Sequence, residues 1–213
     1  VKTVNEFRTL SPIRRLGYRL YRFMPFILIF GPIYYALILM RFPVINRPGW
    51  KKTRLSLVYN NIYIALLWAV VGSLVGFKAF FLIQIPILII FFMIAVWFFY
   101  IHHQHEGTYK QWKENWVFIL AAVKGCTYYK LPRILQWFSG NIGFHHIHHL
   151  SSKIPNYNLE KCAKENPVFN KYVTTLTLRK SLNTVFNHLW DEERQKMISF
   201  RQFYRTERKR IKV

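Results

Sequence analysis

The chain has 213 residues, of which 52% are hydrophobic and 18% aromatic, and it carries a formal net charge of +22 at pH 7. Basicity alone would permit a nucleic-acid-binding protein, but a soluble domain rarely combines such a charge with so many apolar residues. The apolar residues gather into long uncharged runs, and the charges lie between them. This pattern is typical of a membrane protein whose basic flanks face an anionic leaflet, and we expect no nucleic acid among its partners.

The first apolar run, residues 23–40, is interrupted by two prolines and a glycine. Basic residues flank it on both sides, namely Arg14, Arg15, Arg19 and Arg22 before it and Arg41, Arg47, Lys51, Lys52 and Arg54 after it. The positive-inside rule places both flanks in the cytoplasm, and a segment that crosses once cannot keep both ends on one side. We therefore expect 23–42 to be an interfacial or re-entrant segment, with an ordinary third span as the alternative.

Two uncharged runs follow, 55–77 and 79–101, and only Lys78 separates them. At a rise of about 1.5 Å per residue, each run is long enough to cross a hydrocarbon core of about 30 Å. The pair predicts a tight transmembrane hairpin whose two ends lie on the same side of the membrane. Aromatic residues at 97–100, near the exit of the second run, are typical of a membrane interface.

Beyond residue 101 the sequence is more polar. Apolar residues at helical spacing predict an amphipathic helix over 109–123 and a short helix over 131–139, and we expect further helices over 158–165, 168–189 and 191–205. The basic tail, 194–212, is expected to be solvated or to contact lipid. The expected fold class is thus an all-α membrane protein, with the hairpin, the interfacial or re-entrant segment and a cytoplasmic helical region over 102–213.

All but one of the eight histidines fall in two clusters. In the second cluster, His145, His148 and His149 occupy positions i, i+3 and i+4, which share one face of a helix. Neutral imidazoles on one face can bind a borderline metal such as Fe, Zn, Ni or Cu. His146 points about 100° away, so we expect it beside the metal site rather than in it. The isolated His188 is expected to be structural.

The first cluster, His102, His103 and His105, follows directly on the second apolar run. By itself it could be a solvated, pH-sensitive helix end without a metal, and Glu106 could be an iron ligand, a partner that orients a histidine, or a helix cap. Because the hairpin returns the chain to the side from which it started, both clusters can meet on the cytoplasmic side. The two cysteines, Cys126 and Cys162, have no ligand spacing and are expected to be reduced packing residues.

Two stretches of this sequence resemble membrane fatty acid desaturases of the bacterial acyl-lipid type. Residues 99–109 (FYIHHQHEGTY) resemble the segment before the last histidine box, and residues 131–157, with Gly-Asn-Ile-Gly before HxxHH, resemble the third box and its surroundings. Residues 6–12 and 15–22 resemble the region after the second box, so the resemblance covers nearly the whole chain. The family carries an HxxxH box and two HxxHH boxes, of which only the last is present. The resemblance implies a single desaturase domain over 1–213, truncated at its N-terminus and inactive by itself, with the other boxes before Val1.

The resemblance also implies roles for particular residues. His103 would be an extra ligand between boxes, and the third box would supply the ligands His145, His148 and His149. The family often has Gln where this chain has His102 and Phe where it has His105, so neither is assigned as a ligand. Glu106 matches a common acidic position, and Asn141 and His146 are expected to support the site from beside it.

The implied reaction is the O₂-dependent desaturation of fatty acyl chains, carried by lipids, at a non-haem diiron site. The implied partners are the acyl lipid, membrane lipids and an electron donor such as ferredoxin or flavodoxin, in preference to one of the cytochrome b5 type. The protein would be integral to a bacterial inner membrane, with the histidine box on the cytoplasmic side. The alternatives are a related membrane diiron hydroxylase or conjugase, and a non-catalytic membrane metal-binding protein.

Overall fold

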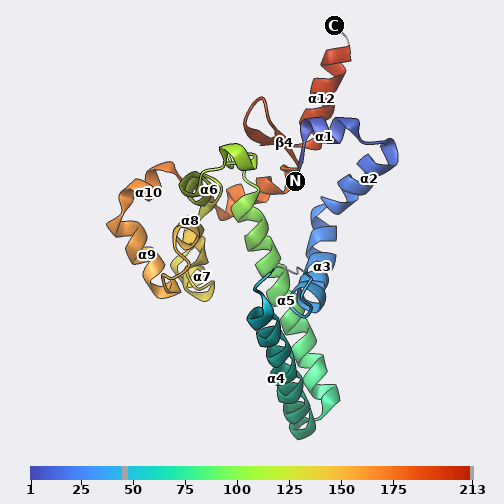
Figure 1. Ribbon diagram of the computed structural model, residues 1–213, viewed down its shortest axis with the longest axis vertical. Helices are drawn as coiled ribbons and strands as arrows, with labels where there is room; N and C mark the ends of the chain where they lie inside the picture. The colour runs from blue at the N-terminus through green and yellow to red at the C-terminus, as the bar shows by residue number, and fades with distance from the viewer. Residues whose placement is uncertain (45–47, 212–213) are drawn as a thin grey trace. The chain divides into compact units, whose positions relative to one another are not determined.

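The computed structural model describes residues 1–44 and 48–211 (Figure 1). Most of these residues are helical, so the expected all-α membrane fold is confirmed, although five short strands also occur among the described residues. The chain divides into two compact units, one formed by Val1–Tyr18 with Phe99–Val213 and the other by Arg19–Phe98.

The unit Arg19–Phe98 contains the expected apolar hairpin. It is formed by α4 (Lys51–Val75) and by the greater part of α5 (Phe77–His103), which run side by side in Figure 1. Both helices are long and apolar enough to cross a membrane. They are in contact through aromatic side chains, since the ring of Trp68 packs edge-on against that of Phe80 with centroids 5.7 Å apart.

The hairpin turns at Gly76, two residues before the predicted turn at Lys78. Gly76 has φ +87°, a conformation that glycine adopts easily and L side chains rarely do. The sequence prediction ended each span at a charge, yet α4 begins at Lys51 and α5 continues to His103. A helical backbone can extend past the hydrocarbon region because long basic side chains at its ends reach toward water.

The segment before the hairpin forms a bent pair of helices. After α2 (Pro12–Tyr21), α3 (Met24–Tyr34) continues into the π-helix η1 (Tyr35–Leu39). Together they are apolar enough for a span but are bent by 71° at their break, as in a broken span or a re-entrant loop. The interfacial or re-entrant role of 23–42 stays a prediction, and Arg47 of its basic flank lies outside the described residues.

The other unit contains a three-stranded sheet that joins the beginning of the chain to its end. Strand β4 (Leu189–Asp191) pairs in parallel with β1 (Lys2–Thr3) and antiparallel with β5 (Lys196–Ile198). The helices α1 (Val4–Thr9) and α12 (Phe200–Ile211) pack on it through a buried core of Phe7, Leu189, Ile198 and Phe203.

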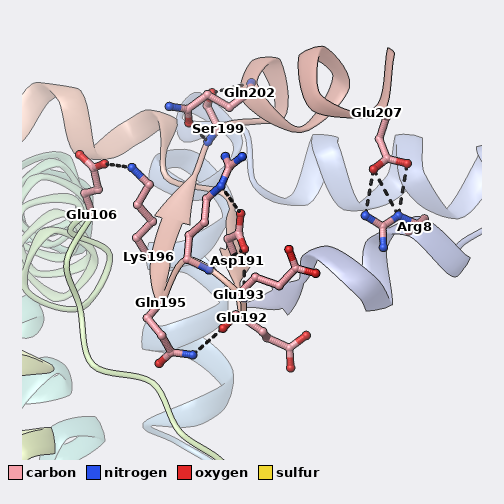
Figure 2. A network of polar contacts seen from close by, with 11 residues as sticks. Arg8, Glu106, Asp191, Glu192, Glu193, Gln195, Lys196, Ser199, Gln202 and Glu207 are labelled. Atoms are coloured by element: carbon pink, nitrogen blue, oxygen red, sulfur yellow. Dashed lines mark hydrogen bonds and ion pairs between the residues drawn. The ribbon is translucent and has the colours of Figure 1, made fainter. Parts of the chain in front are cut away.

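An ion pair reinforces this packing. The guanidinium of Arg8 lies 2.9 Å from the carboxylate of Glu207 and joins α1 to α12 (Figure 2). The predicted helix over 191–205 is wrong, because this stretch contains the end of β4, the strand β5 and only the first part of α12. Lys212, at the end of the tail, lies outside the described residues.

A second, two-stranded sheet organises the histidine region. Strands β2 (Thr127–Lys130) and β3 (Thr174–Thr177) pair in parallel, with Thr127 opposite Thr174. The helices of this region are α6 (Phe118–Lys124), α7 (Arg133–Phe138), η3 (Ile142–Phe144), α8 (His145–Leu150), α9 (Asn156–Glu165) and α10 (Pro167–Tyr172). Its apolar core consists of Phe144, Ile147, Leu159 and Ala163.

Two predicted helices in this region are wrong. The stretch 168–189 contains α10, β3, α11 (Leu178–Ser181), η4 (Leu182–Phe186) and the first residue of β4. Three of the four residues of β3 are threonine, and β-branched side chains favour strands. The expected region 102–213 is thus helical with short strands inserted.

The stretch 109–123 is also not one helix. It holds the short 3₁₀ turn η2 (Lys113–Asn115) and then α6. The hydroxyl of Tyr109 donates to the carbonyl of Asn115 at 2.9 Å and accepts from the amide of Val117 at 3.1 Å. This side chain closes a loop that competes with helix formation.

Candidate metal centre

The third-box segment folds as it does because its glycines allow the backbone to turn sharply. Gly140 has φ +62° and Asn141 has φ +57°, both in the left-handed region. A Cβ on Gly143 would collide with the carbonyl oxygen of Tyr129 in β2. The Gly-Asn-Ile-Gly motif therefore brings the start of α8 directly against β2, and His145 is the first residue of that helix.

Three imidazoles converge at this place. Nε2 of His145 lies 3.1 Å from Nε2 of His103 and 3.1 Å from Nε2 of His149. His103 comes from the last turn of α5, whereas the other two lie one helical turn apart on α8. With Cys126, these residues form a group in which one ligand atom from each lies within 4.8 Å of all the others.

The contacts at His145 fit a metal ion better than a hydrogen-bonded trio. A neutral imidazole nitrogen carries either one proton or one lone pair, so Nε2 of His145 cannot donate a proton to both neighbours. A cation placed among the three nitrogens would accept a lone pair from each. Burial, with the nearby imidazoles of His102 and His103, holds the pKa of His145 far below its ordinary range, so the ring stays neutral and able to bind a cation.

Neighbouring groups fix the orientation of these rings. Nδ1 of His103 lies 3.3 Å from the carbonyl oxygen of Gly125, and a donated N–H there leaves Nε2 free to bind a metal. The ring of His102 stacks on that of His145 with centroids 4.2 Å apart, and its Nδ1 lies 2.8 Å from the hydroxyl of Thr127. His102 thus supports the centre through its ring, and no part of the family resemblance had assigned it this place.

His148 lies outside this group. Its ring centroid is 5.8 Å from that of His145 and 5.9 Å from that of His149, on the same short helix. The structure therefore joins positions i and i+4 of the HxxHH motif to His103. The role of His148 as a ligand stays a prediction.

The remaining histidines, two from the clusters and the isolated His188, have different surroundings. His146 is buried, with Nε2 3.3 Å from the side-chain oxygen of Asn170, and burial lowers its pKa to about 4. His105 is also buried, and burial lowers its pKa to about 4. His188 stacks on Phe200 with ring centroids 4.3 Å apart, as a structural histidine would.

The polar residues that were expected beside the site make other contacts. The carboxylate of Glu106 lies 3.0 Å from the ammonium of Lys196 on β5, an exposed ion pair that Figure 2 shows. The side chain of Asn141 donates to the carbonyl of Asn156 at 3.1 Å, which ties the motif to the start of α9. In this structure both residues hold the segments around the centre rather than its rings.

Cys126 is the residue that the sequence analysis missed. It was expected to be a packing residue, but its sulfur lies 3.8 Å from Nδ1 of His103 and belongs to the convergent group. Burial raises the pKa of its thiol to about 12. No spacing signal could reveal it, because its partners lie on α5 and α8 and meet it only when the chain folds.

A cavity of about 290 Å³ reaches this centre. Its wall includes three members of the group, His103, Cys126 and His149. The rest of the wall is mainly aromatic and small apolar side chains, among them Tyr109, Trp116, Phe118, Ala121 and Ala122. A small molecule or the end of an apolar chain could therefore approach the converging nitrogens.

Comparison with known proteins agrees with the histidine motifs. Residues 3–179 match the family model for fatty acid desaturases. A fatty acid desaturase of Bacillus subtilis (strain 168) is 46% identical over 201 residues, which are 93% of this chain and 56% of that protein. The chain thus spans somewhat more than half the length of this curated relative. With the match to the family model over most of its length, the chain belongs to the fatty acid desaturase family.

Proposed function

We propose that this chain supplies one metal-binding part of the active site of a membrane enzyme that introduces double bonds into fatty acyl chains. The observation that carries the proposal is the convergence of Nε2 atoms from His103, His145 and His149 in a chain of this family. Removal of hydrogen from unactivated methylenes is beyond acid–base side chains, so the reaction needs a redox-active metal. Imidazole donors suit iron, and we propose a non-haem diiron site.

Bound iron would supply the oxidising chemistry with O₂ as co-substrate. The reaction removes two hydrogen atoms from adjacent methylenes, and O₂ with two further electrons and two protons leaves as two molecules of water. We propose that a ferredoxin or flavodoxin supplies the electrons. An acidic donor of this kind would be attracted by the net positive charge of the chain, +22.

The chain's own residues would hold and shield the reacting segment. The cavity beside His103 and His149 has aromatic walls, including Trp116 and Phe118, that would exclude water and position an acyl chain. Gly125, through its carbonyl, would keep Nε2 of His103 directed at the metal. These residues would hold His103 in place and line the approach to the metal.

The second iron would need ligands that this chain does not contain. Only one convergent group of histidines and cysteines is found among residues 1–44 and 48–211. His148, which directly precedes His149 on α8, would serve that neighbouring ion. We propose that further histidines, belonging to the missing boxes, complete that second position, and that the 213-residue chain alone is inactive.

The apolar hairpin would anchor the enzyme in the membrane that contains its lipid substrate. We propose the bacterial inner membrane, with the histidines on the cytoplasmic side, because basic residues flank the apolar segments. A related hydroxylase or conjugase would use the same donor set and differ in its product.

The test expresses the complete coding sequence that contains this chain in cells without a desaturase and measures their acyl chains by mass spectrometry. We expect unsaturated chains with the wild-type sequence and their loss in His149→Ala. The matched control is His188→Ala, because His188 lies outside the convergent group and should leave the product in place. Hydroxylated chains would favour the alternative enzyme, and an unchanged product in His149→Ala would contradict the assigned centre.

A further inference from the structure

We propose that Cys126 is a fourth ligand at the convergent group, and that the chain by itself binds one thiophilic divalent cation there, such as zinc or cobalt. The site would have a Cys-His₃ donor set, with imidazoles from His103, His145 and His149. The inference uses the imidazoles of the proposed active site but does not depend on the desaturation reaction. It assigns a metal-binding role to a cysteine that the histidine motifs do not include.

The distances are close to those of a tetrahedral site. With Zn–N bonds of about 2.0–2.1 Å and a Zn–S bond of about 2.3 Å, neighbouring nitrogens lie roughly 3.3 Å apart and sulfur lies roughly 3.6 Å from each nitrogen. The Nε2 atoms of the histidines are 3.1 Å apart across both contacts of His145, and the ligand atoms of all four residues, the Cys126 sulfur included, lie within 4.8 Å of one another. The imidazole nitrogens that meet at His145 therefore already have nearly tetrahedral spacing, and a shift of the Cys126 side chain by roughly 1 Å at most would bring the sulfur to its place.

The four donors stand on elements whose positions are fixed independently. Cys126 directly precedes β2, which is paired along its whole length with β3. The next residue, Thr127, contacts His102, and His102 stacks on His145. Because backbone pairing and ring packing already hold the donors near one another, little ordering remains to be done when an ion binds.

The sulfur has no strong competing interaction. Its contacts, with the ring of His103 at 3.8 Å and with the carbonyl of Ala121 at 3.9 Å, are long even for sulfur. Cys126 is 1% exposed, yet it lines the cavity of about 290 Å³ together with His103 and His149, so an ion has a route to it. The ion would displace the thiol proton of Cys126 to solvent, and the resulting thiolate beside imidazoles favours zinc or cobalt over magnesium or manganese, which prefer oxygen ligands.

The experiment titrates the purified, metal-free chain in detergent with Co²⁺ under anaerobic conditions. We expect one equivalent to bind, with a thiolate-to-cobalt charge-transfer band in the near ultraviolet and the strong visible bands of tetrahedral cobalt. In Cys126→Ser the charge-transfer band should disappear and the affinity should fall at least about 10-fold. The matched control is Cys162→Ser, which removes the other free cysteine and should leave both signals unchanged.

A second measurement on the unmodified chain keeps the proposal testable if Cys126→Ser fails to fold. Zinc-edge X-ray absorption should show one sulfur at about 2.3 Å and nitrogen at about 2.0–2.1 Å. Zinc bound to nitrogen and oxygen alone, or a charge-transfer band that survives in Cys126→Ser, would overturn the proposal. Neither result would contradict the proposed desaturation, because that proposal is tested separately by the product analysis of His149→Ala.

Discussion

The two histidine segments of this chain use their side chains in different ways. Residues 102–105 begin in the last turn of the long apolar helix α5, whereas residues 145–149 lie within a short helix that begins at His145. The first segment sends one ring, that of His103, to the convergent group, and the second sends two. Each segment also buries an imidazole elsewhere, His105 and His146 respectively. Clustering in a sequence therefore does not by itself mean convergence, because the local backbone decides which rings meet.

The largest effect is expected from removing the ring of His145, which connects the second segment to the first. His145 contacts both His103 and His149 through one nitrogen. We expect His145→Ala to weaken the binding of Co²⁺ to the purified chain by about 100-fold or more, since a ligand and the link between the segments are lost together. Isothermal titration calorimetry would measure this change. A loss smaller than that in Cys126→Ser would contradict the central place of His145.

A matched pair on α8 sharpens the comparison within the second segment. His149→Ala should weaken Co²⁺ binding by about 10- to 100-fold, because its Nε2 belongs to the convergent group. His148→Ala should leave the affinity of the isolated chain unchanged, because that ring lies outside the group. The same calorimetric titration applies to both variants. Equal losses would show that three rings of the HxxHH motif share one ion, as the helical spacing alone predicts.

A third variant tests how the first segment is held in place. The hydroxyl of Thr127 lies 2.8 Å from Nδ1 of His102, and both residues are buried. We expect Thr127→Val to lower the free energy of unfolding by about 1–3 kcal/mol, because a buried polar contact is lost without a change in shape. Metal affinity should fall by about 10-fold, since His102 stacks on the ligand His145.

Thermal unfolding in detergent would follow the stability of that variant. The control is Thr175→Val, which changes an exposed threonine on β3 and should shift the unfolding temperature little. Stability that is equal in the two variants would show that the contact between His102 and Thr127 does not support the centre.

These sites also show what the sequence could and could not predict. The apolar hairpin was predictable because charge-free apolar runs of that length rarely form anything but membrane-spanning helices. Its turn, however, lies at Gly76 rather than at Lys78. The HxxHH motif indicated a metal because helical geometry brings i, i+3 and i+4 to one face, although only i and i+4 belong to the convergent group. Cys126 could not be predicted, since its approach to His103 depends on tertiary packing between α5 and the start of β2. The strand at 174–177 was missed for the same reason, because its partner β2 lies far away in the sequence.

The smallest expected effect concerns Glu106, the acidic residue next to the first segment. Its carboxylate pairs with Lys196 at 3.0 Å on an exposed surface, and such pairs contribute about 1 kcal/mol or less. We expect Glu106→Gln to leave the affinity for Co²⁺ unchanged and to lower the unfolding temperature only slightly, as Lys196→Met should. A large loss of metal affinity in Glu106→Gln alone would show that the carboxylate acts on the imidazoles, and the first segment would then contribute more than one group to the centre. If the two variants behave alike, Glu106 serves to fasten the loop after α5 to β5, and His103 remains the sole contribution of its segment.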